Sequence, residues 1–192
     1  MERPTLAVVA DIVRSLVDRG TIHCPKTANK GAVGILCEVL TGIPQSCAHL
    51  DCSDGEVKVF PLKQMHDGSL MPKETIAVTM LNPKSLTEQT EFATSTCGRK
   101  LHRVLFVPYL RENTTCVRFF LPTDLTLTPD ICTQLQRDYD AIRNDHVSGS
   151  GLKSKTGVFL QNRTKGAGGN APKTRAFYLR QSFIHAFVTK TW

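Results

Sequence analysis

Long apolar stretches are missing from this sequence. No run of about 18 or more apolar residues occurs, and the first apolar pattern, MERPTLAVVADIVRSL, is interrupted by Asp11 and Arg14. A membrane-spanning helix or a secretory signal needs a longer or cleaner apolar core. We therefore expect no membrane association and an intracellular location, either cytoplasmic or nuclear.

Disulfide-forming cysteine spacing is also missing. The seven cysteines are odd in number and scattered, and no CxxC pair occurs. This usage predicts reduced thiols rather than a disulfide framework. Cys47, His49 and Cys52 lie close enough for a zinc clip, but the second ligand pair typical of zinc sites is absent, which disfavours that alternative.

Acidic residues are absent from Val147 to Trp192, where eight Lys and Arg residues occur together with several glycines. The remaining 16 basic and 17 acidic residues nearly cancel, so the excess positive charge of the sequence lies in this region. A Gly-rich basic segment predicts a polyanion-binding surface, with Lys153 and Lys155 in a flexible, phosphate-contacting loop. A solvated basic tail is the alternative. Phe159, Phe177, Tyr178 and Phe183 weigh against a tail, because disordered tails are poor in aromatics.

Hydrophobic periodicity predicts one domain of mixed α/β type without internal repeats. Apolar residues at helical spacing, with capping residues at several ends, predict helices over residues 5–19, 30–40, 128–144 and 179–189. Short β-branched and aromatic runs predict strands over residues 56–60, 76–81, 104–107 and 117–121.

The segment LDCSDGEVKVF carries the strongest chemical pattern. Glu56 and Lys58 are two residues apart on a predicted strand, so they share one face. With Asp51 they form D-x4-E-x-K, in which two carboxylates can hold a divalent cation while the lysine orients a water near a phosphate. The alternative is a surface hairpin whose charges have no function.

Glu38 adds to this pattern. It occurs in KGAVGILCEVLTG, a helical segment that is otherwise almost entirely apolar. A carboxylate beside Ile35, Leu36 and Val39 is costly unless it is paired or coordinates a cation. We therefore expect Glu38 to be buried and to need a partner.

Five segments together resemble the family of MutH, a mismatch-repair endonuclease that nicks one DNA strand, and of its relatives among restriction enzymes. They occur in the family's order, at similar intervals: KGAVGILCEVLTG, DCSDGEVKVFPLKQ, TSTCGRKLHRVLFVPY, GVFLQNRTKGA and AFYLRQSF. The resemblance covers roughly Asn29–Leu110 and Gly157–Ala186. It implies that Glu38 is the helix glutamate beside the active site, that Glu56 and Lys58 are the ExK pair, and that Lys100 supports catalysis.

The same resemblance implies DNA-reading residues in the last two segments. Arg163 and Lys165 match the DNA-reading loop of the family, and Tyr178 matches a tyrosine near the recognised bases. Thr96 departs from the pattern, because the family has a histidine four positions before the lysine.

The metal-binding aspartate also departs from the pattern. In MutH it lies seven residues before the ExK glutamate, whereas Asp51 lies five before it, a spacing similar to that of the monomeric restriction enzymes MvaI and BcnI. We therefore expect Asp51 and Glu56 to be the metal ligands, with Asp54 as the fallback.

The fold that the resemblance implies is a restriction-endonuclease-like α/β core, in which helices flank a mixed sheet. A catalytic lobe of about residues 1–125 and a DNA-recognition lobe of about residues 126–192 would form a cleft for duplex DNA. The implied activity is Mg²⁺-dependent, sequence-specific hydrolysis of one strand at a GATC-like site, by a monomer that a MutL-like protein could activate. Two alternatives remain: a monomeric restriction enzyme with another target, and a DNA-binding protein that has lost catalysis.

Overall fold

The computed structural model describes residues 2–46, 49–165, 174–188, 190 and 192. Cys47 of the zinc alternative and the centre of the basic region, residues 166–173, lie outside the described residues. The chain forms two compact units. Unit 1 comprises Met1–Glu74, Arg103–Thr126 and Val188–Trp192, and unit 2 comprises Thr75–His102 and Leu127–Phe187. Unit 2 therefore draws on a stretch well before residue 126.

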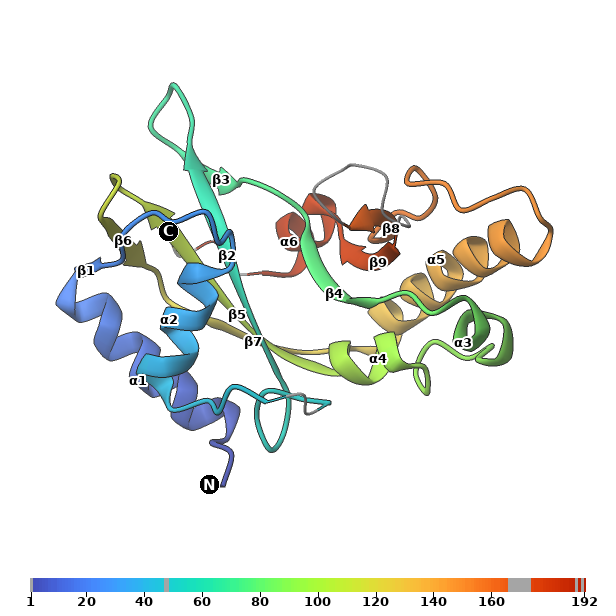
Figure 1. Ribbon diagram of the computed structural model, residues 1–192, viewed down its shortest axis with the longest axis horizontal. Coiled ribbons are helices and arrows are strands. Elements are labelled where there is room, and N and C mark those ends of the chain that lie inside the picture. The colour runs from blue at the N-terminus through green and yellow to red at the C-terminus, as the bar shows by residue number, and fades with distance from the viewer. Residues whose placement is uncertain (1, 47–48, 166–173, 189, 191) are drawn as a thin grey trace. The chain divides into compact units, whose positions relative to one another are not determined.

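Unit 1 contains a mixed six-stranded sheet with two helices (Figure 1). The helices and strands are α1 (Leu6–Arg19), β1 (Thr21–His23), α2 (Ala32–Thr41), β2 (Glu56–Gln64), β3 (Leu70–Pro72), β5 (Arg103–Arg111), β6 (Cys116–Phe119) and β7 (Thr123–Thr126). The strand order is β1-β6-β5-β2-β3, and β7 pairs with β5. Only the β2–β5 pair is parallel; the other pairs are antiparallel. The predicted mixed α/β sheet flanked by helices is confirmed.

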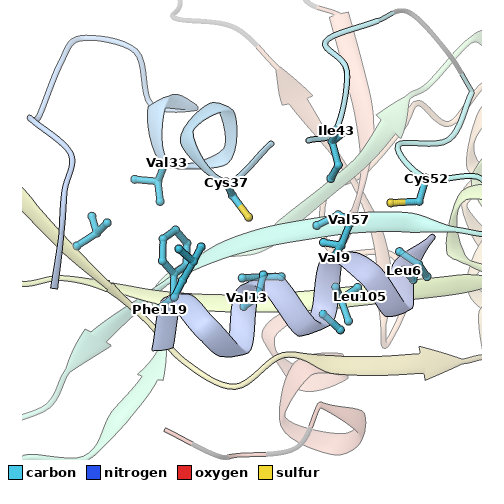
Figure 2. Close-up of a cluster of buried hydrophobic side chains, with 14 of the residues drawn as sticks. Leu6, Val9, Val13, Val33, Cys37, Ile43, Cys52, Val57, Leu105 and Phe119 are labelled. Atoms are coloured by element: carbon cyan, nitrogen blue, oxygen red, sulfur yellow. The ribbon is translucent and has the colours of Figure 1, made fainter. Parts of the chain in front are cut away.

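Helix α1 forms because its apolar residues recur on one face. Thr5 accepts a hydrogen bond from the Val8 amide at the start of the helix, and Gly20 ends it with a φ of 76°. Figure 2 shows Leu6, Val9 and other side chains of α1 directed toward residues of the sheet. This face of α1 and the inner face of α2, which carries Val33 and Cys37, are buried in one core with residues of the strands. Their burial holds both helices against the sheet of unit 1.

Unit 2 contains a three-stranded antiparallel sheet and four helices, in the strand order β4-β9-β8. Its elements are β4 (Ile76–Met80), α3 (Pro83–Glu88), α4 (Thr96–Leu101), α5 (Pro129–Val147), β8 (Leu160–Lys165), β9 (Thr174–Leu179) and α6 (Gln181–Phe187). Helix α5 starts as predicted, with the Thr128 hydroxyl capping the helix and Pro129 in the first turn.

Every predicted helix and strand is present, within a few residues at its ends. The basic sequence after residue 144 also predicts loop and hairpin structure, and the β8–β9 pair lies there. The short elements β1, β3, β7, α3 and α4 are additions. None of the described helices has the length and apolar character to cross a membrane.

A buried carboxylate organises unit 2. Asp138 on α5 is 3% exposed and accepts hydrogen bonds from the backbone amides of Val158, Phe159 and Leu160 at 2.7–2.8 Å. The side chain of Gln134, one turn earlier, donates to the same carboxylate at 3.0 Å. These bonds satisfy three consecutive backbone amides and set the point where β8 begins.

We expect Asp138→Asn to destabilise unit 2 by about 2–4 kcal/mol, because an amide group would face N–H donors that now meet a carboxylate. Urea denaturation, with hydrogen exchange to follow the amides of unit 2, measures the effect. Asp140→Asn on the same helix is the matched control, since Asp140 accepts a side-chain hydrogen bond from Gln136 and none from the backbone amides before β8. Equal effects of the two variants would contradict the role of Asp138.

Candidate active site

The first residues of β2 carry a buried ion pair. Glu56 and Lys58 project from the same face of the strand, and Lys58 Nζ lies 2.7 Å from Glu56 Oε1. Their side chains are only 2% and 14% exposed. The alternative of a solvent-exposed charged hairpin is therefore wrong. Burying two charges is expensive even when they are paired, so such a pair is a candidate for function rather than for stability.

Asp51 and Asp54 lie in the turn before β2 and have different partners. Asp51 Oδ2 accepts the Val57 amide at 3.0 Å, which holds this carboxylate beside the start of the strand. Asp54 Oδ1 accepts the Leu6 amide at 2.7 Å, and its Oδ2 lies 2.7 Å from Arg103 Nη1. Both oxygens of Asp54 thus bond to the protein framework, which disfavours Asp54 as a ligand-binding group.

Glu38 on α2 belongs to the same electrostatic neighbourhood. Desolvation raises the pKa of Glu38, the negative charge of Asp51 raises it further, and Lys58 partly offsets both effects. The expectation of a fully buried Glu38 is wrong, because its side chain is half-buried. The neighbouring Ile35 and Val39 are themselves 40% and 64% exposed, since only one face of α2 meets the core.

Acidic groups also surround the buried thiol of Cys52. Burial raises its pKa to about 12, and the charges of Asp51, Asp54 and Glu56 add to this effect. The thiol is therefore neutral at physiological pH in the metal-free protein. The six described cysteines are all free, as expected for reduced thiols.

The donor set suits a hard divalent cation. The charge of Asp51 raises the pKa of Glu38 and of the Cys52 thiol, and such clustered negative charge is stabilised when a cation lies nearby. Mg²⁺ prefers oxygen ligands of this kind. Among the described residues, no cluster of three or more His, Cys, Asp or Glu side chains is arranged to hold a metal ion. Asp51 and Glu56 are the carboxylates that could hold a cation here, with water or substrate as further ligands.

Lys100 lies in α4 of unit 2, whereas the ExK pair lies in unit 1. Ser95 caps α4 by accepting the Gly98 amide at 3.0 Å. Gly98 is required there, because a Cβ atom would lie 1.9 Å from the carbonyl oxygen of Phe92. The Lys100 side chain is half-buried, and its support of catalysis stays a prediction.

The β8–β9 hairpin brings two of the expected DNA-reading residues together. The Arg163 guanidinium lies 5.8 Å from the centre of the Tyr178 ring, a cation–π distance, and also donates to Thr75 Oγ1 at 2.9 Å. Lys165 is exposed at the end of β8, where it pairs with Thr174. These contacts orient Arg163 and Tyr178 on the same surface of unit 2.

The loop before β8 is more firmly held than the sequence suggests. Arg180 Nη2 donates to the carbonyl oxygens of Ser154 and Thr156 at 3.0 and 3.3 Å. Lys153 and Lys155 are both exposed, and Lys153 lies 3.7 Å from a carboxylate oxygen of Asp145. The charge of Arg180 therefore helps to hold this loop, whereas the two lysines remain open to a ligand.

The arrangement of an acidic turn, an ExK strand and a flanking helix glutamate on a mixed sheet is the one expected of a nuclease of the restriction-endonuclease type. A family model described as DNA mismatch repair enzyme MutH matches residues 45–145, just over half of the chain. The chain belongs to the MutH family, and is thus placed among DNA endonucleases. The match includes Asp51, Glu56, Lys58 and Lys100 but neither Glu38 nor the β8–β9 hairpin.

Among solved structures, the chain is similar to a restriction endonuclease MvaI–cognate DNA substrate complex. The identity is 11%, the TM-score is 0.45, and the match covers 91% of this chain and 92% of that chain. Among curated proteins, no sequence matches this chain.

The raised pKa of Glu38 predicts that its ionised carboxylate lowers the stability of the folded protein at neutral pH. Because the folded-state pKa is above the unfolded value of about 4.3, stability falls as pH rises through the interval between the two values. We expect Glu38→Gln to melt at a higher temperature than the parent at neutral pH in EDTA, with the difference shrinking near pH 4. Thermal denaturation at both pH values checks this, with the exposed Glu2→Gln as control. A less stable Glu38→Gln variant at neutral pH would show that the carboxylate contributes stability instead.

Proposed function

We propose that the chain is a Mg²⁺-dependent, sequence-specific endonuclease that hydrolyses one phosphodiester bond of duplex DNA, at a GATC-like site, in mismatch repair or restriction. The observation that carries this proposal is the buried Glu56–Lys58 pair, with the Asp51 carboxylate held at the start of the same strand. Membership of the MutH family supports the reaction class.

Each residue of the site has a role that its position supports. Asp51 and Glu56 would hold the cation, which supplies charge neutralisation at the phosphate when it is bound. Lys58 would position the attacking water and stabilise negative charge on the phosphate, because its ammonium group is fixed by Glu56 at 2.7 Å. Glu38 would orient Lys58, to which it is electrostatically coupled.

One active site in each chain supports single-strand nicking by a monomer, so that two molecules or two events would be needed to cut both strands. Arg163, Lys165 and Tyr178 would read the target, while Lys153, Lys155 and Lys100 would contact phosphates. The proposal also includes activation by a MutL-like protein. Its support is membership of the MutH family.

We expect Glu56→Gln to abolish nicking of a supercoiled plasmid in Mg²⁺ while duplex binding in EDTA is retained. The substitution keeps the shape of the side chain but removes the charge that holds both the cation and Lys58. Parent protein that binds duplex DNA yet nicks nothing in Mg²⁺ would instead support the alternative of a DNA-binding protein without catalysis.

The paired variants Asp51→Asn and Asp54→Asn test the choice of aspartate. Asp51→Asn should fold normally and fail to nick, whereas Asp54→Asn should be less stable, because it weakens the bonds to Leu6 and Arg103, but should nick at temperatures where it is folded. The opposite pattern would make Asp54 the ligand.

Recognition is expected to depend on the Arg163–Tyr178 pair. Alanine at either position should reduce the preference for target over random duplex by about 1–3 kcal/mol for each base contact. Because the two side chains touch, the double variant should lose less than the sum of the single losses. Competition binding measures this, with Lys155→Ala as the control that should weaken all sequences alike. Uniform weakening by Arg163→Ala would make it a phosphate contact.

A further inference from the structure

Unit 1 has a second charged feature, which we term the unit 1 groove. It is a cavity of about 910 Å³ formed by the segment before α2, the start of α2, the end of β2, the residues after β3, and the ends of β5 and β6. Its lining includes six cationic side chains, Lys26, Lys30, Lys63, Lys73, Arg111 and Arg118. Its anionic side chains are Glu74 and Glu112, so the groove carries a net excess of positive charge.

Most of this positive charge is not neutralised by neighbouring carboxylates. Arg118 pairs with Glu112, so these two charges cancel. Arg111 donates to the carbonyl oxygen of Cys24 at 2.8 Å, a neutral acceptor that orients the guanidinium without removing its charge. The four lysines of the lining, Lys26, Lys30, Lys63 and Lys73, are exposed. Within the part of the chain that the structure describes, none of them makes an ion pair within 4 Å.

The walls of the groove are fixed by backbone hydrogen bonds. The Lys26 amide donates to the carbonyl oxygen of Thr114 at 2.7 Å, which fastens the segment before α2 to the β5–β6 turn. The Lys73 amide donates to the carbonyl oxygen of Pro61 at 2.8 Å and continues the β2–β3 pairing. A charged surface on a rigid frame binds a ligand with a smaller loss of conformational entropy than one on free loops.

We propose that the unit 1 groove binds the sugar-phosphate backbone of duplex DNA beside the cleaved bond. Cations that come from separate segments around one open groove suit an extended polyanion better than a single phosphate group. The groove also adjoins the active site along two elements. Ala32 and Glu38 are about 9 Å apart along α2, and Lys58 and Leu62 are about 13 Å apart along β2.

At 3.4 Å per base pair, these distances correspond to roughly three or four base pairs. The groove would therefore hold flanking phosphates on one side of the cut and extend the contact surface beyond the β8–β9 hairpin. That DNA is the polyanion rests on the proposed function, whereas the charge of the groove does not.

The variant Lys63→Ala/Lys73→Ala tests the proposal against the matched control Arg14→Ala/Arg19→Ala, which removes two exposed cations from α1 in the same unit. Each protein is titrated with a labelled duplex of about 30 base pairs in EDTA, between about 50 and 200 mM salt. If each lysine contacts one phosphate, the slope of log K against log salt falls by about 0.9 for each. From about 50 to 200 mM salt, the affinity of the parent for the duplex then falls by a factor about ten times larger than that of the groove variant. The control should show the same fall as the parent.

Equal slopes for the groove variant and the control would overturn the proposal, as would failure of the parent to bind duplex DNA. A changed slope for single-stranded RNA but not for duplex DNA would also overturn it. Nicking of a plasmid by the parent in Mg²⁺ is measured separately, so that loss of the proposed catalytic function is distinguished from failure of the groove. Hydroxyl-radical footprints should lose protection on one side of the target in the groove variant only.

Discussion

The active-site strand depends on a close crossing of three chain segments at Gly55. A Cβ atom at this position would lie 2.4 Å from Leu6 Cδ1 and 2.7 Å from the carbonyl oxygen of Arg103, so only glycine fits. The preceding Asp54 bonds to the Leu6 amide and to Arg103, and Arg103 in turn pairs with Asp124 of β7. The start of α1 and the start of β5 are thereby joined immediately before Glu56. The position of the ExK pair is set by this framework rather than by the pair itself.

The same framework explains how unit 1 tolerates clustered negative charge. Asp54 is neutralised by Arg103 and by the amide at the start of α1, which removes one acidic group from the electrostatics of the site. Glu56 is compensated by Lys58. Glu38 and Asp51 remain mutually repulsive, as the raised pKa of Glu38 indicates. Such repulsion lowers the stability of the fold, as is common where side chains are placed for function rather than for stability.

The helices and strands with strong periodicity were predictable from the sequence, because residues such as Val9 and Val13 recur at helical spacing whatever the tertiary context. The ExK pair was also predictable, since two positions on one strand share a face. The roles of Asp138 and Arg180 were not, because their partners are backbone groups 20 or more residues away in sequence. Backbone donors and acceptors carry no sequence signal.

One error has a clear physical origin. The apolar composition around Glu38 suggested full burial, but a helix buries only the face that meets its neighbours, and Val39 lies on the other side. The near-neutral charge before Val147 also conceals a local pattern. Folding separates those charges, gathering acidic groups at the turn before β2 and lysines around the unit 1 groove.

The interleaving of the two units has a consequence for how the protein forms. Unit 1 needs β5 to complete the parallel pair with β2, and the whole of Thr75–His102 lies between these strands in sequence. Trp192 then packs on Phe60 at a ring distance of 6.2 Å and donates to the carbonyl oxygen of Leu70 at 3.0 Å. The unit that bears the ExK pair is therefore closed by residues that follow all of unit 2. Such long-range pairing slows folding, and it means that the residues of the active site acquire their final surroundings only after most of the chain has been synthesised.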